Sequence, residues 1–394
     1  MSNTDKKSTG QKTAFLLAAI LFSSFVFAQK DNKPYTTIDT AIFSDAAHHW
    51  YDLYEKDRVI QPKPNQPRYQ ATELISIADN ILLYQKNNGG WPKNYDIQAI
   101  LTPRQKDSLI KDKIVLNTTF DNRTTYSHVT CLANIYNVTK IEKYKEAALN
   151  GLDFILSAQY TNGGWPQYFP LETKNYSSHI TYNDDAFAGI MYLLKDISAG
   201  NPEYDFIDGD RRKKLNASFN NGLQCILKTQ INDTGKPTAW CQQYDETTLE
   251  PAWARKFEPP SICNGESVDI VLLLMSIKNP SKEVIDAVNY AVEWFEKSAI
   301  PGIRVKTISA PPLVTPYKIS NYDKVVVQDS TAPPIWTRYY ELKTHRPLFC
   351  NRDSKVVYSL AEVDRERRDG YAWYTYNPQK ILNQYAAWSK KWVK

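Results

Sequence analysis

The stretch DNILLYQKNNGGWP at residues 79–92 decides the fold, because it recurs 74 positions later as DFILSAQYTNGGWP at residues 153–166. In both copies, apolar residues recur at helical spacing up to a Gly-Gly-Trp-Pro sequence. Glycine readily adopts the left-handed conformation that commonly ends a helix. Each copy therefore predicts a helix that ends at its glycine pair, followed by a loop that begins at Trp-Pro.

Fainter copies extend the repeat along the chain. A third copy occupies residues 226–240 and a Trp-Phe pair at 294–295 marks a fourth, with further helices predicted at residues 130–138 and 186–197. A repeat of about 70 residues that holds two helices is typical of helical hairpins stacked side by side. Three or four hairpins predict a fold dominated by α-helices, an α/α toroid built as an incomplete (α/α)3 barrel, with its loops gathered on one face.

The two ends of this repeat region differ from it in composition. Prolines that would break helices recur throughout residues 301–334, and residues 324–328 predict a short strand. We expect residues 300–394 to form a smaller layer, rich in loops and strands, that covers the toroid within a single domain of residues 71–394. Residues 29–70 contain several prolines and no repeat, and are predicted to be a tether followed by a leading helix.

The first 28 residues carry the pattern of a secretory signal peptide. Three lysines precede an apolar run at residues 14–27, and Ala28 supplies the small residue before Gln29. The run is shorter than the roughly 20 apolar residues that span a bilayer, so a cleaved signal is favoured over a membrane anchor. We therefore expect residues 1–28 to be removed and the protein to be exported to the periplasm or the medium, without a stable membrane span.

Composition excludes several classes of protein. The 48 basic and 43 acidic residues give a net charge of +5, and no dense basic run points to a nucleic-acid partner. The five cysteines are an odd number without a CxxC pair, which argues against a disulfide framework and against zinc. We expect a monomer with a large hydrophobic core.

The repeat has two possible family affiliations. The pattern Gln-x3-Gly-x-Trp, at Gln85 and Gln159, resembles the QW repeat of terpene cyclases, which are also α/α toroids. That alternative predicts an Asp-x-Asp-Asp proton donor. The comparable stretch, TYNDD at residues 181–185, lacks the first aspartate of this motif.

A second resemblance covers nearly all of the chain after residue 28. Eight segments in chain order resemble the pectate lyases of polysaccharide lyase family ten: TTFDN at 118–122, NGGWPQY at 162–168, ITYNDDA at 180–186, WCQQYD at 240–245, PAWARKFE at 251–258, the stretch 261–267, RYYE at 338–341, and the arginines of 346–368 before DGYAWY at 369–374. This resemblance implies a calcium-dependent enzyme that cleaves polygalacturonate by β-elimination.

The chemistry of that reaction indicates which residues are needed. A lyase removes the proton on carbon 5 of a uronate, and a cation must neutralise the adjacent carboxylate as charge develops. Calcium prefers the carboxylate and amide oxygens that Asp121, Asn122, Asp184 and Asp185 supply. The resemblance implies that Asp121 and the Asp184-Asp185 pair flank a Ca2+ ion that contacts substrate. A purely structural interpretation makes both segments caps of the helices that follow them.

The resemblance also implies a catalytic base. Arg255 is the arginine of the Pro-Ala-x-Ala-Arg motif and would accept the carbon-5 proton. An arginine is almost never neutral at pH 7. We therefore expect a crowded cationic site that lowers the pKa of Arg255, and activity that rises into the alkaline range. The structural alternative for Arg255 is a surface ion pair with Glu258.

By resemblance, arginines of the C-terminal layer bind the uronate carboxylates. These are Arg338, Arg352 and Arg367, whose guanidinium forks suit bidentate binding, although the sequence does not distinguish Arg367 from Arg368. Lys256, beside the base, is assigned to substrate binding as well. The tryptophans of the Trp-Pro loops are expected to pack the rim of the toroid rather than to stack on sugar.

Two further functions fit the same residues. A glycoside hydrolase on this fold would use two carboxylates, Asp121 and Asp184, to direct water at the anomeric carbon of a polysaccharide that contains uronate. A catalytically inactive protein that binds polyuronate would keep the groove without turnover. Formation of a double bond, its dependence on calcium, and turnover itself separate these alternatives from a lyase.

Overall fold

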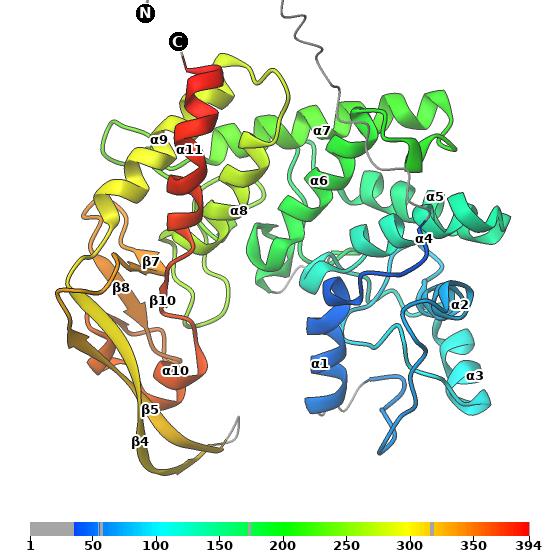
Figure 1. Ribbon diagram of the computed structural model, residues 1–394, viewed down its shortest axis with the longest axis horizontal. Coiled ribbons are helices and arrows are strands. Elements are labelled where there is room, and N and C mark those ends of the chain that lie inside the picture. Colours follow the sequence, from blue (N-terminus) through cyan, green and yellow to red (C-terminus); the bar gives the residue numbers. More distant parts are fainter. Residues whose placement is uncertain (1–34, 54, 56–57, 172–174, 316–318, 394) are drawn as a thin grey trace, which may run out of the picture. The chain divides into compact units, whose positions relative to one another are not determined.

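Four helices carry the repeated sequence: α2 (Leu74–Tyr84), α5 (Glu142–Ala158), α7 (Gly209–Thr229) and α9 (Lys282–Ser298). In the computed structural model each packs against the next one in this series. The structure describes residues 35–393 except 54, 56–57, 172–174 and 316–318, and this part forms one unit. Figure 1 shows the chain passing through these helices from blue-cyan to yellow.

A second set of helices lines the other side of this series. Helices α4 (Tyr126–Thr139), α6 (Ala186–Ser198) and α8 (Asn264–Met275) pack against one another and against α5, α7 and α9 respectively. Helix α11 (Pro378–Trp392) then packs on both α8 and α9. Three antiparallel hairpins arranged in two layers are the α/α toroid that the repeat predicts, and the helices expected at 130–138 and 186–197 are confirmed as α4 and α6.

The glutamine of each repeat ties neighbouring hairpins together. Its side-chain amide donates to a carbonyl of its own glycine loop and to a carbonyl in the next helix of the series. These bonds are Gln85 to Gly89 and Ala147 (both 2.9 Å), Gln159 to Gly163 (2.9 Å) and Ser218 (3.0 Å), and Gln230 to Thr238 and Ala287 (both 2.9 Å). Each glutamine stands at the same position of the repeat and bonds to the next helix. The sequence pattern therefore determines how neighbouring hairpins stack.

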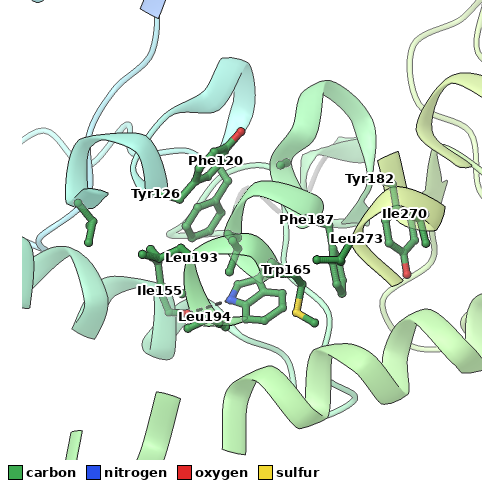
Figure 2. Packing of buried hydrophobic residues seen from close by; sticks show 14 of the residues in the cluster. Phe120, Tyr126, Ile155, Trp165, Tyr182, Phe187, Leu193, Leu194, Ile270 and Leu273 are labelled. Atoms are coloured by element: carbon green, nitrogen blue, oxygen red, sulfur yellow. Dashed lines mark hydrogen bonds between the residues drawn. The ribbon is translucent and has the colours of Figure 1, made fainter. Parts of the chain in front are cut away.

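The tryptophan of each repeat is buried, and its indole N–H donates to a carbonyl of the preceding helix. The four bonds are Trp91 to Ile81 (2.8 Å), Trp165 to Ile155 (2.9 Å), Trp240 to Ile226 (2.8 Å) and Trp336 to Phe295 (2.8 Å). Figure 2 shows the Trp165 bond within the core. The predicted packing role of Trp91 and Trp165 is therefore confirmed. The fourth repeat takes its tryptophan from position 336, because a β-ribbon separates it from α9.

The glycine pairs do not end the helices directly, as the sequence had suggested. Helix α2 ends at Tyr84 and α5 at Ala158, and the glycines lie in the tight turn that follows. Gly89 and Gly163 have φ values of +89° and +94°. A Cβ atom at Gly163 would collide with the backbone carbonyl of Asn221 in α7, so glycine is needed for the close approach of the next helix.

The C-terminal layer contains most of the strands. Strands β4 (Ile303–Val314) and β5 (Ile319–Gln328) form a two-stranded antiparallel ribbon that is longer than the short strand predicted at 324–328. The register shifts between Ser309 and Leu313, where two prolines cannot donate to the ladder. Strands β3 (Ile262–Cys263), β7 (Tyr339–Tyr340), β8 (Pro347–Cys350) and β9 (Val356–Val357) form a small sheet.

That sheet covers a second, smaller hydrophobic cluster, which includes Phe257, Phe349 and Trp373. The remaining elements are α1 (Ser44–Asp52), α3 (Pro103–Asp112), α10 (Arg365–Gly370), β1 (Ile180–Thr181), β2 (Gln243–Tyr244), β6 (Trp336–Thr337) and β10 (Tyr374–Thr375). All five cysteines are free and buried. Among the described residues, no helix combines the length and the apolar character needed to cross a membrane. The predicted signal peptide lies outside these residues.

Candidate active site

Two short 3-10 turns, η2 (Asp121–Arg123) and η4 (Asn183–Asp185), lie against each other where α4 and α6 begin. Their backbones match: Asn122 and Asp184 have φ values of +51° and +52°, and the residue after each has +60°. Residues other than glycine rarely adopt positive φ, and such positions cluster at functional sites. Neither turn caps a helix through its side chains, since Thr125 caps α4 and α6 has no side-chain cap bond.

Asp121 is buried, with 3% of its surface exposed. One carboxylate oxygen, Oδ2, forms an ion pair with the ammonium of Lys93, whereas the other, Oδ1, has no hydrogen-bond partner. Lys93 also lies 5.4 Å from the centre of the Tyr168 ring. Burial alone would lower the pKa of Lys93, but the charges and hydrogen bonds of Asp121 and Tyr168 together outweigh it and raise that pKa. The lysine is therefore a permanent cation beside a carboxylate with a free oxygen.

Asp184 connects the acidic turns to the rest of the site. Burial, together with the negative charges of Asp121 and Glu266, raises the pKa of Asp184 to about 7, against the opposing effect of Arg255 and Arg338. Turn η4 also packs against both η2 and α8, whose Glu266 pairs with Arg338 (2.6 Å). The carboxylates and the arginines predicted from distant parts of the sequence therefore meet in one site.

The other two predicted calcium ligands, Asn122 and Asp185, lie beside Asp184. Asn122, Asp184 and Asp185 line one cavity of about 330 Å³. The amide of Asn122 donates to Asn94 (3.1 Å), and Asp185 accepts from Arg123 (3.0 Å). The structure therefore brings three of the four predicted ligands to a common space.

The donor set suits a hard cation. Asp121 Oδ1 and the amide oxygen Oδ1 of Asn183 are both buried without a partner, and carboxylate and amide oxygens are the ligands of calcium. Among the described residues, one group of three His, Asp or Glu side chains brings its ligand atoms within 4.8 Å of one another, namely His179, Asp245 and Glu246. That group was not predicted, and His179 and Glu246 are already paired at 2.9 Å.

The predicted arginines lie over two aromatic rings. The guanidinium groups of Arg255, Arg352 and Arg367 are 5.0, 5.2 and 4.6 Å from the centre of the Phe257 ring. That of Arg338 is 4.8 Å from the neighbouring Tyr371 ring. Cations are stabilised over aromatic faces, so these two rings form a floor that gathers four positive charges.

Three carboxylates form ion pairs with these arginines. Glu258 pairs with Arg255 (2.8 Å) and accepts from the Tyr371 hydroxyl (2.8 Å), and Glu266 pairs with Arg338 (2.6 Å). Glu366 of α10 pairs with both Arg352 (2.8 Å) and Arg367 (3.1 Å). Four guanidinium groups against three carboxylates leave one net positive charge in the cluster, which favours an anionic ligand.

The environment of Arg255 differs from the one predicted. Burial would lower its pKa, but the hydrogen bonds and charge of Glu258 outweigh that effect, so the pKa of Arg255 is raised. The expectation of a lowered pKa is therefore wrong for the unliganded protein, because a buried carboxylate and not a further cation contacts the guanidinium. The pair is not a surface ion pair either, since Glu258 is fully buried while Arg255 is 45% exposed.

The structure distinguishes Arg367 from Arg368. Arg368 forms a bidentate pair with Asp323 of β5 (2.7 and 2.6 Å), which fixes the ribbon to α10. Lys256 is exposed. The sequence did not predict Lys93 or Glu366 as site residues. The available signal for Lys93 was its position directly after the first Trp-Pro. The available signal for Glu366 was the Arg-Glu-Arg-Arg run that contains it.

Oxygen-rich turns beside an arginine cluster can hold a cation and an anionic substrate together, which is what a polyuronate lyase requires. Comparison with known families agrees: the chain belongs to the pectic acid lyase family, whose model matches residues 85–382. The family affiliation and enzyme class predicted from the sequence are thus confirmed, and the terpene cyclase alternative is wrong.

Solved structures give the same result. A family 10 polysaccharide lyase from Cellvibrio cellulosa is 28% identical, with a TM-score of 0.66 over 80% of this chain and 91% of that one. A mutant of a family 10 polysaccharide lyase from the same organism, in complex with trigalacturonic acid, is 27% identical, with a TM-score of 0.66 over 81% and 93%. No curated protein sequence matches.

Proposed function

We propose that this protein is an exported, calcium-dependent pectate lyase that cleaves polygalacturonate by β-elimination. The observation that carries the proposal is the position of η4, which packs against both η2 and α8, whose Glu266 pairs with Arg338. A uronate placed there would contact both the oxygen-rich turns and the arginines. The trigalacturonic acid bound by the related lyase supports polygalacturonate as the substrate.

Asp121, Asn122, Asp184 and Asp185 would hold Ca2+ in this proposal, with Asn183 as a further oxygen donor. When bound, calcium supplies positive charge that neutralises the uronate carboxylate and makes the carbon-5 proton more acidic. Lys93 keeps one oxygen of Asp121 fixed while the other stays free. These residues therefore bind and orient the sugar that loses its proton.

Arg255 is the proposed base. It accepts the proton from carbon 5, and the electrons form the carbon 4–carbon 5 double bond as the glycosidic oxygen leaves. Its raised pKa makes the neutral form rare in the unliganded protein, so the rate should increase with pH well into the alkaline range. The Arg255 guanidinium is exposed and can contact substrate, while its ion pair with the buried Glu258 fixes its position.

Arg338, Arg352 and Arg367 are proposed to bind the carboxylates of the uronates, with Lys256 at the exposed edge. The aromatic floor and Glu366 hold Arg352 and Arg367 side by side, which suits two carboxylate oxygens or two successive uronates. Arg368 is not included, because its guanidinium binds Asp323 of the β-ribbon and not the carboxylates of the arginine cluster.

The test is to incubate the purified protein with polygalacturonate at alkaline pH, with calcium or with a chelator, and to follow ultraviolet absorbance. Absorbance that rises with calcium and stops with chelator supports the proposal, and Arg255→Ala should abolish it. New reducing ends without absorbance would indicate a hydrolase that uses Asp121 and Asp184. Binding of the polymer without either product would indicate an inactive polyuronate-binding protein. Localisation of the mature protein in the producing cells tests export separately.

A further inference from the structure

Trp253 is the one exposed tryptophan among the ten of this chain, all of which lie in the described residues. It is 40% exposed, whereas most of the others are buried. The indole N–H of each buried tryptophan donates to an oxygen of the protein. Within the described part of the chain, the Trp253 side chain has neither a hydrogen bond nor an aromatic partner. It therefore presents a free N–H and an uncovered ring, in a residue type that proteins usually bury.

Trp253 lies two residues before Arg255, in the segment that follows β2. Ala252 and Ala254 of this segment are partly buried. Trp253 and Arg255, which alternate with them, are exposed. Alternation with a period of two is typical of extended backbone, in which every second side chain points to the same face. The indole ring and the guanidinium thus share one face, and their Cα atoms are about 7 Å apart.

Hydrogen bonds fix the backbone on both sides of Trp253. The N–H of Ala252 donates to the carbonyl of Gln243 in β2 (3.0 Å). On the other side, the N–H of Ala254 donates to the carbonyl of Glu258 (3.1 Å). Because this segment is already ordered, a ligand that binds to the ring does not have to overcome the entropy of fixing it.

Strand β2 connects this segment to the acidic turns. Its residue Gln243 pairs with Thr181 of β1, and β1 leads into η4, which contains Asp184 and Asp185. The segment that carries Trp253 and Arg255 is therefore joined through β2 to the backbone of the proposed calcium ligands. A chain that occupies the site between these ligands and Arg255 has Trp253 beside it.

A galacturonate unit matches the groups that are exposed here. A pyranose ring has a face of C–H groups that can pack on an aromatic ring, and its hydroxyl groups can accept from an indole N–H. Its carboxylate is attracted to cations, and the two charged residues that follow Trp253, Arg255 and Lys256, are exposed cations. An apolar ring beside two positive charges favours an anionic sugar over a neutral apolar ligand.

We propose that Trp253 stacks on the galacturonate unit next to the one that Arg255 deprotonates. The inference rests on the proposed function, because it places Trp253 on the same substrate. Stacking on sugar, which the buried Trp91 and Trp165 cannot provide, is then the role of Trp253. The ring contacts no reacting atom, so it binds substrate and transition state alike. Its removal should therefore raise KM and change kcat little.

The first test compares the kinetics of elimination in substituted proteins. Trp253→Ala should raise KM about tenfold, the binding lost with one stacked ring, at nearly unchanged kcat. Trp253→Tyr keeps a ring and should recover most of the affinity. Tyr322→Ala is the matched control, because it removes a ring that is 50% exposed on β5, and its KM should not change. All three proteins should unfold at nearly the same temperature as the unsubstituted one, since both rings are exposed.

The second test uses the fluorescence of Trp253, which is the exposed tryptophan. Acrylamide in solution should quench mainly this residue, because the other tryptophans are buried or partly buried. Trigalacturonic acid bound to the Arg255→Ala protein, which cannot turn it over, should reduce the quenching. In an Arg255→Ala, Trp253→Tyr protein, both the quenching and its reduction by the ligand should be largely lost.

An unchanged KM in Trp253→Ala, or quenching that trigalacturonic acid does not reduce, would overturn the inference and leave the lyase proposal intact. If the unsubstituted protein forms no double bond, the lyase proposal fails, and the fluorescence test alone decides the role of Trp253. Reduced quenching would then support a uronate bound at this ring without elimination. Quenching that stays the same would exclude it.

Discussion

Replacing Lys93 by methionine should strengthen calcium binding to the free protein. Lys93 is the cation paired with Asp121, whose other oxygen is buried and unpartnered. The substitution keeps the length of the side chain and removes its charge. Asp121 then loses its counter-ion, and its negative charge becomes available to a metal ion together with that of Asp184.

The size of the effect follows from Coulomb's law. Two unit charges 4 Å apart interact by about 4 kcal/mol at an effective dielectric constant of 20, so a dication near an ammonium is repelled by about 8 kcal/mol. The Lys93 side chain is 29% exposed, so solvent and salt screen much of this repulsion. If a quarter remains, about 2 kcal/mol, the dissociation constant for calcium falls about 30-fold.

Calorimetric titration of Ca2+ into the substrate-free protein measures this directly. Lys143→Met is the matched control, since it removes an equal charge from α5, where Lys143 forms an exposed pair with Asp79 of α2. Asp121→Asn should abolish binding in either background. Calcium affinity that is unchanged or weaker in Lys93→Met, in a protein that still folds, would refute the placement of the cation at Asp121.

Other predictions concern stability and the base. Gly163→Ala should cost about 3 kcal/mol by urea unfolding, from a positive φ and a collision with Asn221, whereas Gly235→Ala, with φ +84° and open space, should cost only about 1 kcal/mol; equal costs would contradict the close packing of α7. Because Glu258 raises the pKa of Arg255, Glu258→Gln should move the pH profile of kcat/KM about one unit lower, and an unmoved profile would argue against Arg255 as the base. Burial lowers the pKa of His128 from 6.5 to about 3, so the unfolded chain binds the extra proton and stability should fall by about 1.4 kcal/mol for each pH unit below 6.5, down to about 3. His128→Gln should lose this contribution, which unfolding curves across that range would show.

The repeat made the toroid predictable because the repeated glutamine and tryptophan make the same contacts in every copy. Gln85, Gln159 and Gln230 reach the next helix, and the tryptophans anchor each loop to its own helix. Of the β-ribbon, only residues 324–328 of β5 were predicted as a strand, because the ribbon interrupts the fourth copy. Only the pairing of β4 with β5, and not any local pattern, shows that residues 303–314 are a strand.

The site was only partly predictable for a similar reason. Asp121, Asp184 and Arg255 stand in recognisable motifs, but the partners that set their charge lie far away in the chain. Lys93 follows the first Trp-Pro and Glu366 stands in the Arg-Glu-Arg-Arg run, but their roles appear only when folding places them beside Asp121 and Arg352. The direction of the pKa shift of Arg255 could not be read from neighbouring cations, because a buried carboxylate decides it.

Each copy of the repeat contributes at least one charged residue to the candidate site. Asp121, Asp184, Glu266 and Arg338 follow the first, second, third and fourth tryptophans, respectively. A fragment that lacks any one copy would therefore lack a charged residue of the site, even if the remaining hairpins folded. Catalysis in this protein should behave as a reporter of complete assembly, lost at the first local unfolding event and recovered only when the last hairpin has docked.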